Sequence, residues 1–564
     1  MNKNILTLRN KFKKYDIDGY IVPKNDDYFT EYSKINRLKI ISNFSGSAGL
    51  AVILKKKNYL FTDGRYTIQS QIESGKNFKI VNSEKLINCN FIKNLKLGID
   101  PKLFTHQLIK KCFLKYNKIK FIKENLIDQI QKKKINDSSP FFLLNKNIVG
   151  ESSNSKLNKI TNYLKKNKSD FIFISAPENV AWILNIRGSD GPNSPMPNSR
   201  LIISKTKKII LISKRKKCKK LLKKKVIGSH QFIDIDELSK KILDLKGKNF
   251  IIDENSCSIY YENIIKSKFK IVKREDPTYF LKSIKNKTEI DNMKKAHISD
   301  GVALTKFLYW IKNINKKKIS EVDAQNKLEK FRKMNKNFLY PSFDTIAGSG
   351  KNGAIVHYRA NKKNCKIIRN NDIFLCDSGG QYKYGTTDVT RTIYFSKPNK
   401  NIKNIFTYVL KGHIAVATTN LKIDDIGKKI DLRARKYLRQ NNLDYAHGTG
   451  HGVGFFLNVH EGPQSISKIN KVKIKEGMIL SNEPGYYKKN KFGIRIENLV
   501  YVKKMKNKIF FENLTLAPIE KDLINYHLLN LTEKNYLFNY HLKVYSNISK
   551  YLNIKEKKWL ASFI

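Results

Sequence analysis

The alternation of apolar and polar residues predicts two β-hairpins in the last third of the chain. In residues 373–395, two runs of alternating polarity flank a centre rich in glycine and aromatic residues, which is typical of a hairpin. Residues 478–502 have the same character, since Ile494 and Ile496 there alternate with charged residues. Both segments are therefore expected to form paired antiparallel strands.

Each predicted hairpin carries a pair of carboxylates. With a turn directly after Tyr382, Asp377 faces Asp388 across the ladder, with Cβ atoms roughly 4.5 to 5.5 Å apart. The second hairpin places Glu483 opposite Glu497 in the same way. Like charges so placed repel each other, and a cation between them reverses the local electrostatics.

Histidines cluster between the two hairpins. Residues 447–463 contain His447, His451 and His460, three of the ten histidines of the chain. The glycine spacing there excludes a stable helix, so these imidazoles are expected on loops or irregular strand. Four carboxylates and an imidazole are the inventory of a two-metal site, and the oxygen-rich set favours Mn²⁺, with Co²⁺ or Zn²⁺ also fitting.

The leading half of the chain predicts two α/β domains. Residues 1–144 contain an apolar run from Asp18 and then, from Phe44, two strands separated by a lysine-rich turn. Residues 145–284 repeat this order of signals, with an amphipathic helix followed by an apolar run from Asp170. We interpret the two segments as similarly folded domains with structural or specificity roles.

A third domain is expected over residues 285–564, where helical and strand patterns mix. Its first helix is predicted to begin near Lys285, with a start at Thr288 and Asp291 that resembles a capping box. The fold class is thus a multidomain α/β and α+β protein. Both hairpins and the histidine cluster lie in this third domain.

The length and net charge of the chain do not change the predicted fold or site. At 564 residues the chain is too long for a single core. A net charge of +62 raises a nucleic-acid hypothesis, but only 15 of the 110 basic residues are arginines and the lysines are scattered. We therefore expect weak attraction to anionic surfaces and no specific nucleic-acid partner.

Cysteine usage and hydropathy predict a soluble, cytoplasmic protein. The six cysteines show no C-x-x-C spacing, which favours reduced thiols. No apolar run approaches the roughly 18 residues that a membrane span needs, and the first residues contain no sustained apolar stretch typical of a secretion signal. No membrane partner is expected.

The motifs of the third domain, in this order and spacing, resemble those of a known family. They are HYRA from His357, DSGGQYKYGTTDVTRT from Asp377, HGTGHGVG from His447, VHEGP from Val459, SNEPGYY from Ser481 and GIRIENL from Gly493. The set is similar to that of aminopeptidase P, the Xaa-Pro aminopeptidases, which group with prolidase, creatinase and methionine aminopeptidase as pita-bread metallopeptidases. Weaker similarity along the whole chain implies the three-domain form, with two creatinase-like domains before a pita-bread domain.

The resemblance implies a role for each metal ligand. Asp377 would hold the first ion, Asp388 and Glu497 would bridge both ions, and His451 and Glu483 would complete the second site. A hydroxide bridging two divalent ions would then attack the peptide bond, and Glu483 would take up its proton and pass it to the leaving amine.

Four further residues are implied in the site. His357, His447 and His460 match the substrate histidines of the family, where one helps donate to the scissile amide, one stabilises the tetrahedral oxyanion and one lines the proline pocket. Which of the three does which is left open. Arg495 is two residues before Glu497 on the same strand face. It would orient a bridging ligand by a hydrogen bond, without contacting the metal itself.

The expected function is a metal-dependent aminopeptidase that removes the N-terminal residue from peptides with proline in second position, and the family suggests a homodimer. Prolidase, which cleaves Xaa-Pro dipeptides, shares the ligand set and is the nearest alternative. Methionine aminopeptidase lacks the leading domains, and creatinase works without the metals. A noncatalytic peptide binder or a nucleic-acid binder are the alternatives from other classes, and metal content would separate them from the enzyme.

Overall fold

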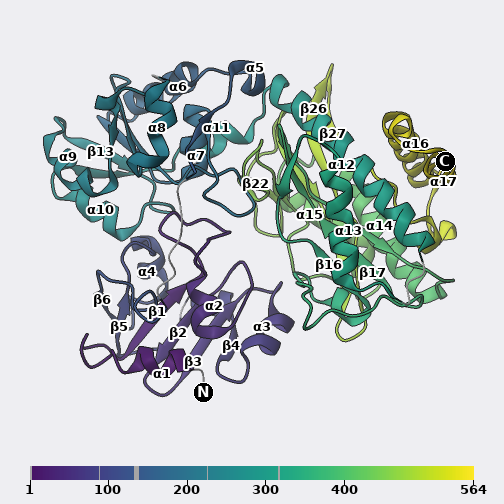
Figure 1. Cartoon of the computed structure of the whole chain (residues 1–564), viewed down its shortest axis with the longest axis horizontal. Helices are drawn as coiled ribbons and strands as arrows, with labels where there is room; N and C mark the ends of the chain where they lie inside the picture. Colours follow the sequence, from purple (N-terminus) through teal and green to yellow (C-terminus); the bar gives the residue numbers. More distant parts are fainter. Residues whose placement is uncertain (1–2, 88, 132–138, 225–226, 315–317) are drawn as a thin grey trace. The chain divides into compact units, whose positions relative to one another are not determined.

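The computed structural model of the chain forms two compact units, Met1–Tyr279 and Phe280–Ile564 (Figure 1). It describes residues 3–87, 89–131, 139–224, 227–314 and 318–564. Among the described helices, none has both the length and the apolar character needed to cross a bilayer. The two units are described in turn.

The first half of unit 1 is built on a six-stranded sheet in the order β4-β3-β2-β1-β5-β6. The strands are β1 (Gly19–Pro23), β2 (Leu50–Leu54), β3 (Asn58–Thr62), β4 (Lys79–Asn82), β5 (Lys96–Ile99) and β6 (Lys118–Phe121). The helices are α1 (Lys3–Arg9), α2 (Arg37–Ser42), α3 (Thr67–Ser74) and α4 (His106–Cys112).

The second half of unit 1 has its own six-stranded sheet, in the order β12-β11-β10-β8-β13-β14. The strands are β8 (Phe171–Ile174), β10 (Arg200–Ser204), β11 (Ile209–Ile212), β12 (Phe232–Ile233), β13 (Asn249–Ile252) and β14 (Lys270–Lys273). The helices are α6 (Ser153–Lys166), α7 (Pro177–Leu184), α8 (Arg215–Lys223), α9 (Leu238–Asp244) and α10 (Ile259–Lys266). Short elements complete unit 1: β7 (Phe142–Leu143), β9 (Ile186–Arg187) and α5 (Lys146–Val149). The boundary to unit 2 lies in α11 (Thr278–Ser283).

The two sheets repeat one topology. Their central strands, β1 and β8, each pair antiparallel with the strand that follows in the sheet, β2 or β10, and parallel with β5 or β13. All residues of β1 and β8 are buried, which explains why these strands read as unbroken apolar runs in the sequence. The repeat predicted from the order of sequence signals is confirmed at the level of strand order and direction.

Unit 2 consists of two halves in which a helix pair precedes a set of strands. The helices are α12 (Lys287–Asn313) and α13 (Glu321–Lys333) in the first half, α14 (Lys400–Ala417) and α15 (Gly427–Arg439) in the second, and α16 (Leu531–Ile548) and α17 (Ile554–Ala561) at the C-terminus. Strands of the first half are β15 (Phe338–Pro341), β16 (Ile346–Ser349), β17 (Phe374–Ser378), β18 (Gly380–Tyr382), β19 (Gly385–Thr386) and β20 (Val389–Ile393).

The second half of unit 2 contributes β21 (Gly450–Gly452), β22 (Glu461–Ile466), β23 (Ile479–Asn482), β24 (Gly485–Lys488), β25 (Phe492–Arg495), β26 (Asn498–Met505) and β27 (Lys508–Asn513). Unit 2 has two three-stranded sheets, β15-β18-β19 and β16-β17-β20, and one five-stranded sheet, β22-β21-β23-β26-β27. Each half thus places a sheet beside its own helix pair, as a pita-bread domain does.

The cap of helix α12 lies two residues before the predicted cap at Thr288. Asn286 is the N-cap: its side chain accepts from Glu289 N at 3.0 Å, and the Glu289 carboxylate accepts from Asn286 N at 3.0 Å. The predicted start at Thr288 and Asp291 is wrong, because both residues already lie inside the helix. Two overlapping capping patterns occur here, and the one with an Asn cap and a Glu at the third position is used.

Candidate metal centre

The first hairpin brings Asp377 and Asp388 to the same place in a register that differs from the prediction. In β17 and β20, Asp377 pairs with Thr390 and Ser378 with Val389. The predicted pairing of Asp377 with Asp388 is wrong, because Tyr382 pairs with Gly385 and the turn is centred one residue later than predicted. A one-residue shift of the turn moves every cross-strand partner by two positions.

The second hairpin has the predicted register. Its flanking pairs are Asn482–Asn498 and Gly485–Arg495. Glu483 and Glu497 therefore occupy facing positions between these pairs. Their backbone amides connect them to the rest of the site: Glu483 N donates to Thr449 O at 2.8 Å, and Glu497 N donates to Thr390 O at 3.2 Å.

Asp388, His451 and Glu497 converge closely enough to share an ion. Each offers a ligand atom, and these atoms lie within 4.8 Å of one another. His451 Nε2 is 3.4 Å from Asp388 Oδ2 and 3.5 Å from Glu483 Oε1. Because His451 Nδ1 lies 2.9 Å from Gly452 O, the proton belongs on Nδ1 and the Nε2 lone pair faces the carboxylates.

The two carboxylate oxygens of Asp377 differ in their hydrogen bonding. Its Oδ2 accepts from Arg495 Nη2 at 2.6 Å. Its Oδ1 is buried, and no donor among the described residues reaches it. A buried carboxylate oxygen without a donor is costly, and a cation would satisfy it.

The electrostatics of the cluster also favour cations. Burial raises the pKa of Asp388 well above its ordinary value, and the nearby charges of Asp377 and Glu483 raise it further. Burial together with Asp388 likewise raises the pKa of Glu497, and burial raises that of Glu483. Ionised carboxylates this close and this buried need opposite charge between them, so the donor set fits two divalent ions.

Arg495 supports the cluster through two contacts. Besides holding Asp377, it donates from Nε to Thr390 Oγ1 at 3.1 Å, and Thr390 Oγ1 donates to Glu497 Oε2 at 2.8 Å. The sequence analysis missed Thr390. The feature of the sequence that indicates Thr390 is the two-residue period of the alternating run, which puts Thr390 on the same strand face as Asp388.

The three predicted substrate histidines lie around this cluster. The ring of His460 is 4.3 Å from that of His451, centroid to centroid. His447 Nε2 is 2.9 Å from the hydroxyl of Tyr487, which also accepts from Arg495 Nη1 at 2.5 Å. His357 lies in the turn after η5 (Gly350–Ala354), next to Val356, whose carbonyl is 3.4 Å from Arg495 Nη2.

Tyr487 is a second residue that the sequence analysis missed. Since Arg495 can only donate, the Tyr487 hydroxyl uses its own proton toward His447 Nε2. His447 Nδ1 is 2.7 Å from Gly448 O and therefore carries the ring proton. This network favours the Nδ1–H tautomer of His447.

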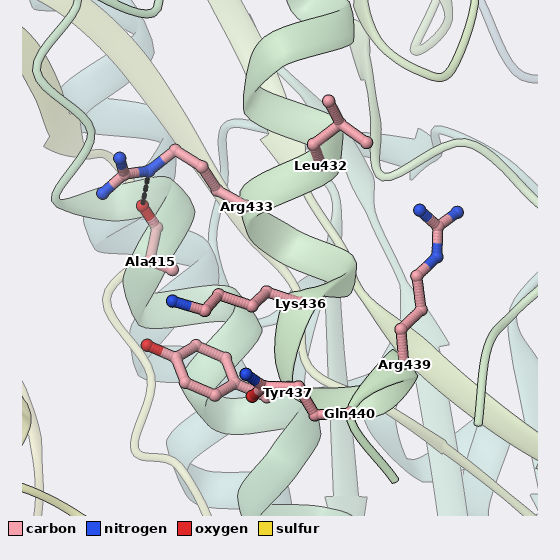
Figure 2. Close-up of a pocket in the computed structure, with 7 residues that line it drawn as sticks. All are labelled: Ala415, Leu432, Arg433, Lys436, Tyr437, Arg439 and Gln440. Atoms are coloured by element: carbon pink, nitrogen blue, oxygen red, sulfur yellow. Dashed lines mark hydrogen bonds between the residues drawn. The ribbon is translucent and has the colours of Figure 1, made fainter. Parts of the chain in front are cut away.

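A separate cavity of about 690 Å³ lies on α14 and α15 and contains none of these residues (Figure 2). It is lined by Ala415, Leu432, Arg433, Lys436, Tyr437, Arg439 and Gln440. Arg433 pairs with Asp424 and Arg439 with Asp444, each at 3.1 Å. Because these pairs neutralise two of its cations, we assign no chemistry to the cavity.

Family comparisons agree with this combination of domains and site. Residues 291–504 match metallopeptidase family M24, and residues 508–562 match the C-terminal region of that peptidase. Residues 5–127 and 132–289 each match the creatinase/prolidase N-terminal domain. The fold and the site define a metallopeptidase with creatinase-type leading domains, and the chain belongs to metallopeptidase family M24.

Full-length relatives place the chain in the aminopeptidase P branch of this family. They confirm the resemblance to aminopeptidase P that the sequence motifs indicated. A probable Xaa-Pro aminopeptidase P of Laccaria bicolor is 36% identical, covering 99% of this chain and 92% of the relative. Xaa-Pro aminopeptidase 1 of Dictyostelium discoideum is also 36% identical, covering 100% and 96%. The structure of X-prolyl aminopeptidase from Caenorhabditis elegans, described as a cytosolic enzyme with a di-nuclear active site, has a TM-score of 0.91 at 28% identity and covers 99% and 98%.

Proposed function

We propose that the chain is a metal-dependent aminopeptidase that cleaves the N-terminal Xaa-Pro bond of peptides. The observation that carries this is the cluster of Asp388, His451 and Glu497, whose ligand atoms lie within 4.8 Å of one another, with Glu483 next to His451 and a buried, donor-free oxygen on Asp377. The full-length relatives named Xaa-Pro aminopeptidase support the substrate class. Prolidase is the alternative, since it would use the same ligands on dipeptides.

The ligands are proposed to divide between two ions. Asp377 would hold the first ion, Asp388 and Glu497 would be ligands of both, and His451 and Glu483 would complete the second. Bound divalent ions, of which Mn²⁺ is preferred and Co²⁺ or Zn²⁺ would also fit, supply Lewis acidity and lower the pKa of water toward about 7.

Glu483 is the proposed proton carrier. Its Oε1 accepts from Ser481 Oγ at 3.0 Å, which fixes the orientation of the carboxylate. Burial raises its pKa, which favours uptake of a proton that the carboxyl group can then pass to the departing amine. The products are an acid and the secondary amine of proline.

The neighbouring histidines are proposed to bind the substrate. His357, His447 and His460 would contact the scissile amide, the oxyanion and the proline ring, in an assignment that stays open. Proline lacks an N–H and holds its φ near −65°, so its pocket needs shape and no acceptor. The free α-amine of the substrate would approach the carboxylate of Asp377.

Four peptides at matched metal loading test the proposal: Xaa-Pro-Yaa, Xaa-Ala-Yaa, N-acetylated Xaa-Pro-Yaa and Xaa-Pro. We expect rapid cleavage of the first and a large loss of kcat/KM for the second, because pocket packing acts on the transition state as well as on binding. Acetylation should stop cleavage. Equal rates for the proline and alanine tripeptides would contradict the proposal, and cleavage of the dipeptide alone would favour prolidase.

We further propose a cytosolic homodimer without a specific nucleic-acid or membrane partner. The cytosolic description of the Caenorhabditis elegans relative supports the location, as do six free cysteines. The dimer rests on the family resemblance. Light scattering of the purified chain would measure its mass against the 65.5 kDa of one copy.

A further inference from the structure

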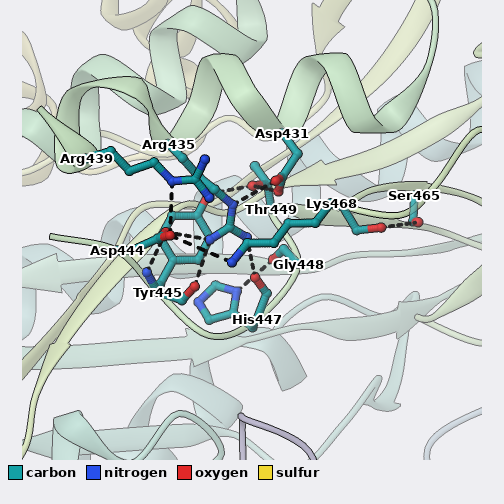
Figure 3. Close-up of polar contacts among 11 residues, drawn as sticks. Asp431, Arg435, Arg439, Asp444, Tyr445, His447, Gly448, Thr449, Ser465 and Lys468 are labelled. Atoms are coloured by element: carbon teal, nitrogen blue, oxygen red, sulfur yellow. Dashed lines mark hydrogen bonds and ion pairs between the residues drawn. The ribbon is translucent and has the colours of Figure 1, made fainter. Parts of the chain in front are cut away.

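The loop that carries His447 is held by one side chain of α15 (Figure 3). Arg435 is 1% exposed. Its Nη1 donates to Tyr445 O at 2.7 Å and its Nη2 to His447 O at 2.6 Å. A single guanidinium thus binds two backbone carbonyls of the loop, one of them that of His447 itself.

Asp431, one turn before Arg435 on the same helix, binds the other end of the loop. Its Oδ2 accepts from Arg435 Nε at 2.7 Å, and its Oδ1 accepts from Thr449 Oγ1 at 2.6 Å. Thr449 O in turn accepts from the backbone amide of Glu483. The Asp431–Arg435 pair therefore connects the loop of His447 with the backbone of Glu483.

Ring contacts also join Arg435, Tyr445 and His447. The guanidinium carbon of Arg435 lies 3.9 Å from the ring centroid of Tyr445, and the Tyr445 ring is 4.8 Å from that of His447. The Tyr445 hydroxyl is 2.5 Å from Thr449 Oγ1. Side chains of α15 thus hold the backbone on both sides of His447. The Tyr487 hydroxyl holds the imidazole at Nε2.

We propose that Arg435 is a positioning residue for His447 and, through it, for peptide cleavage; this inference rests on the proposed function. A lysine cannot replace it, because an ammonium is a point charge, whereas the planar guanidinium binds two carbonyls and the carboxylates of Asp431 and Asp444 at once. The buried carbonyls would then lose their donors, and the loop would shift to recover them. A misplacement of about 1 Å near the reacting atoms costs on the order of 100-fold in rate.

The test compares Arg435→Lys with Arg439→Lys on the full chain loaded with Mn²⁺. Arg439 is the matched control, since it lies one turn further on α15 and shares the partner Asp444 with Arg435, but binds none of the loop carbonyls in any described contact. We expect Arg435→Lys to lower kcat/KM for Xaa-Pro-Yaa roughly 10- to 100-fold with metal content unchanged. Arg439→Lys should stay within about twofold of the parent chain.

A double-mutant cycle separates positioning from general damage. If Arg435 acts through His447, Arg435→Lys should cost little more once His447→Ala is present. The same fold loss in both backgrounds would overturn the inference, while the measured Xaa-Pro cleavage would leave the proposed function standing. Absence of Xaa-Pro cleavage in the metal-loaded parent chain would instead contradict the proposed function.

Thr449 provides a second variant if Arg435→Lys folds poorly. Thr449→Val removes the hydroxyl that reaches Asp431 and keeps the shape of the side chain. We expect it to lower kcat/KM in the same direction, and Thr449→Ser to restore it. Full activity of Thr449→Val would overturn the inference.

Discussion

At the scale of single residues, the site is a set of carboxylates whose charges need a partner. Glu497 illustrates this, because its side chain accepts from Thr390 and its pKa is raised by burial and by Asp388. Removing one such charge lowers the repulsion but also removes a ligand. The number of ions lost therefore distinguishes a bridging ligand from a terminal one.

The first prediction is that Glu497→Gln and Asp388→Asn lower the occupancy of both ions, because each residue is proposed to bridge. His451→Ala should mainly weaken one ion. Elemental analysis after purification in Mn²⁺ measures this, with the parent chain expected to hold up to two ions. Loss of one and the same ion in all three variants would contradict the bridging roles.

The second prediction concerns Asp276 in unit 1, a buried carboxylate that accepts from Asn179 Nδ2 at 2.7 Å. Burial raises its pKa to about 6 from 3.8. The folded chain thus binds this proton more tightly than the unfolded chain, so the contribution of the group to stability is full below pH 3.8 and is lost as pH rises through about 6. Asp276→Asn should therefore gain stability relative to the parent between pH 4 and pH 8, by about 3 kcal/mol at most.

Urea unfolding at pH 4 and pH 8 measures this difference. The Asn179 amide can flip to accept from the new side chain, since no described residue donates to Asn179 Oδ1. Asp170→Asn is a control of opposite sign, because a hydrogen bond from Lys205 lowers the pKa of Asp170 to about 2. Its favourable contribution is present above pH 3.8 and lost as pH falls toward 2, so this variant should lose stability at pH 8.

At the scale of elements, the C-terminal helix α16 reaches the metal centre through one arginine. Arg391 of β20 is buried and donates from Nη1 to Glu497 O at 2.7 Å and from Nη2 to the Tyr540 hydroxyl at 3.0 Å. Tyr540 O–H donates onward to Ala517 O at 2.8 Å. The C-terminal segment thus helps to hold β20, the strand that begins directly after Asp388.

The third prediction follows from this contact. Tyr540→Phe leaves an N–H of Arg391 and the carbonyl of Ala517 each with one partner fewer, so it should destabilise unit 2 by about 1 to 2 kcal/mol. Tyr536→Phe is the matched control, since Tyr536 lies one turn earlier on α16 and its hydroxyl accepts from Asn513 rather than Arg391. Urea unfolding and Mn²⁺ affinity are the measurements. We expect only Tyr540→Phe to weaken Mn²⁺ binding, and equal Mn²⁺ affinity in the two variants would contradict the coupling.

At the scale of the whole molecule, the excess of positive charge is spread over the sequence, and the catalytic centre is built from carboxylates. With 110 basic and 48 acidic residues, the chain is expected to attract polyanions through its diffuse charge. Charge of this kind acts on solubility and encounter rates. It does not select a partner.

The fourth prediction is that DNA binding is weak and without sequence preference, and falls steeply between about 50 and 200 mM salt, because it reflects counterion release alone. Fluorescence anisotropy with two unrelated duplexes of equal length measures it. A tight complex with one duplex at about 150 mM salt would overturn this interpretation of the charge.

The sequence by itself determined the kinds of residue at the site and their order along the chain. Alternating polarity gave the hairpins, the repeated signals gave two matching sheets, and the Glu483–Glu497 register could be predicted because the second turn is symmetric about its centre. These features are local, or repeat locally, so side-chain period and turn residues are enough to specify them.

Tertiary structure alone decided which groups meet. Asp377 faces Thr390 because the first turn is centred one residue later, which sequence pattern did not specify. Arg391 binds a backbone carbonyl 106 residues away and Arg435 binds one 12 residues away, and every residue has such a carbonyl, so no residue type marks the partner. The ligands could be named from the sequence, whereas the hydrogen bonds that orient them depend on contacts that exist only once the chain has folded.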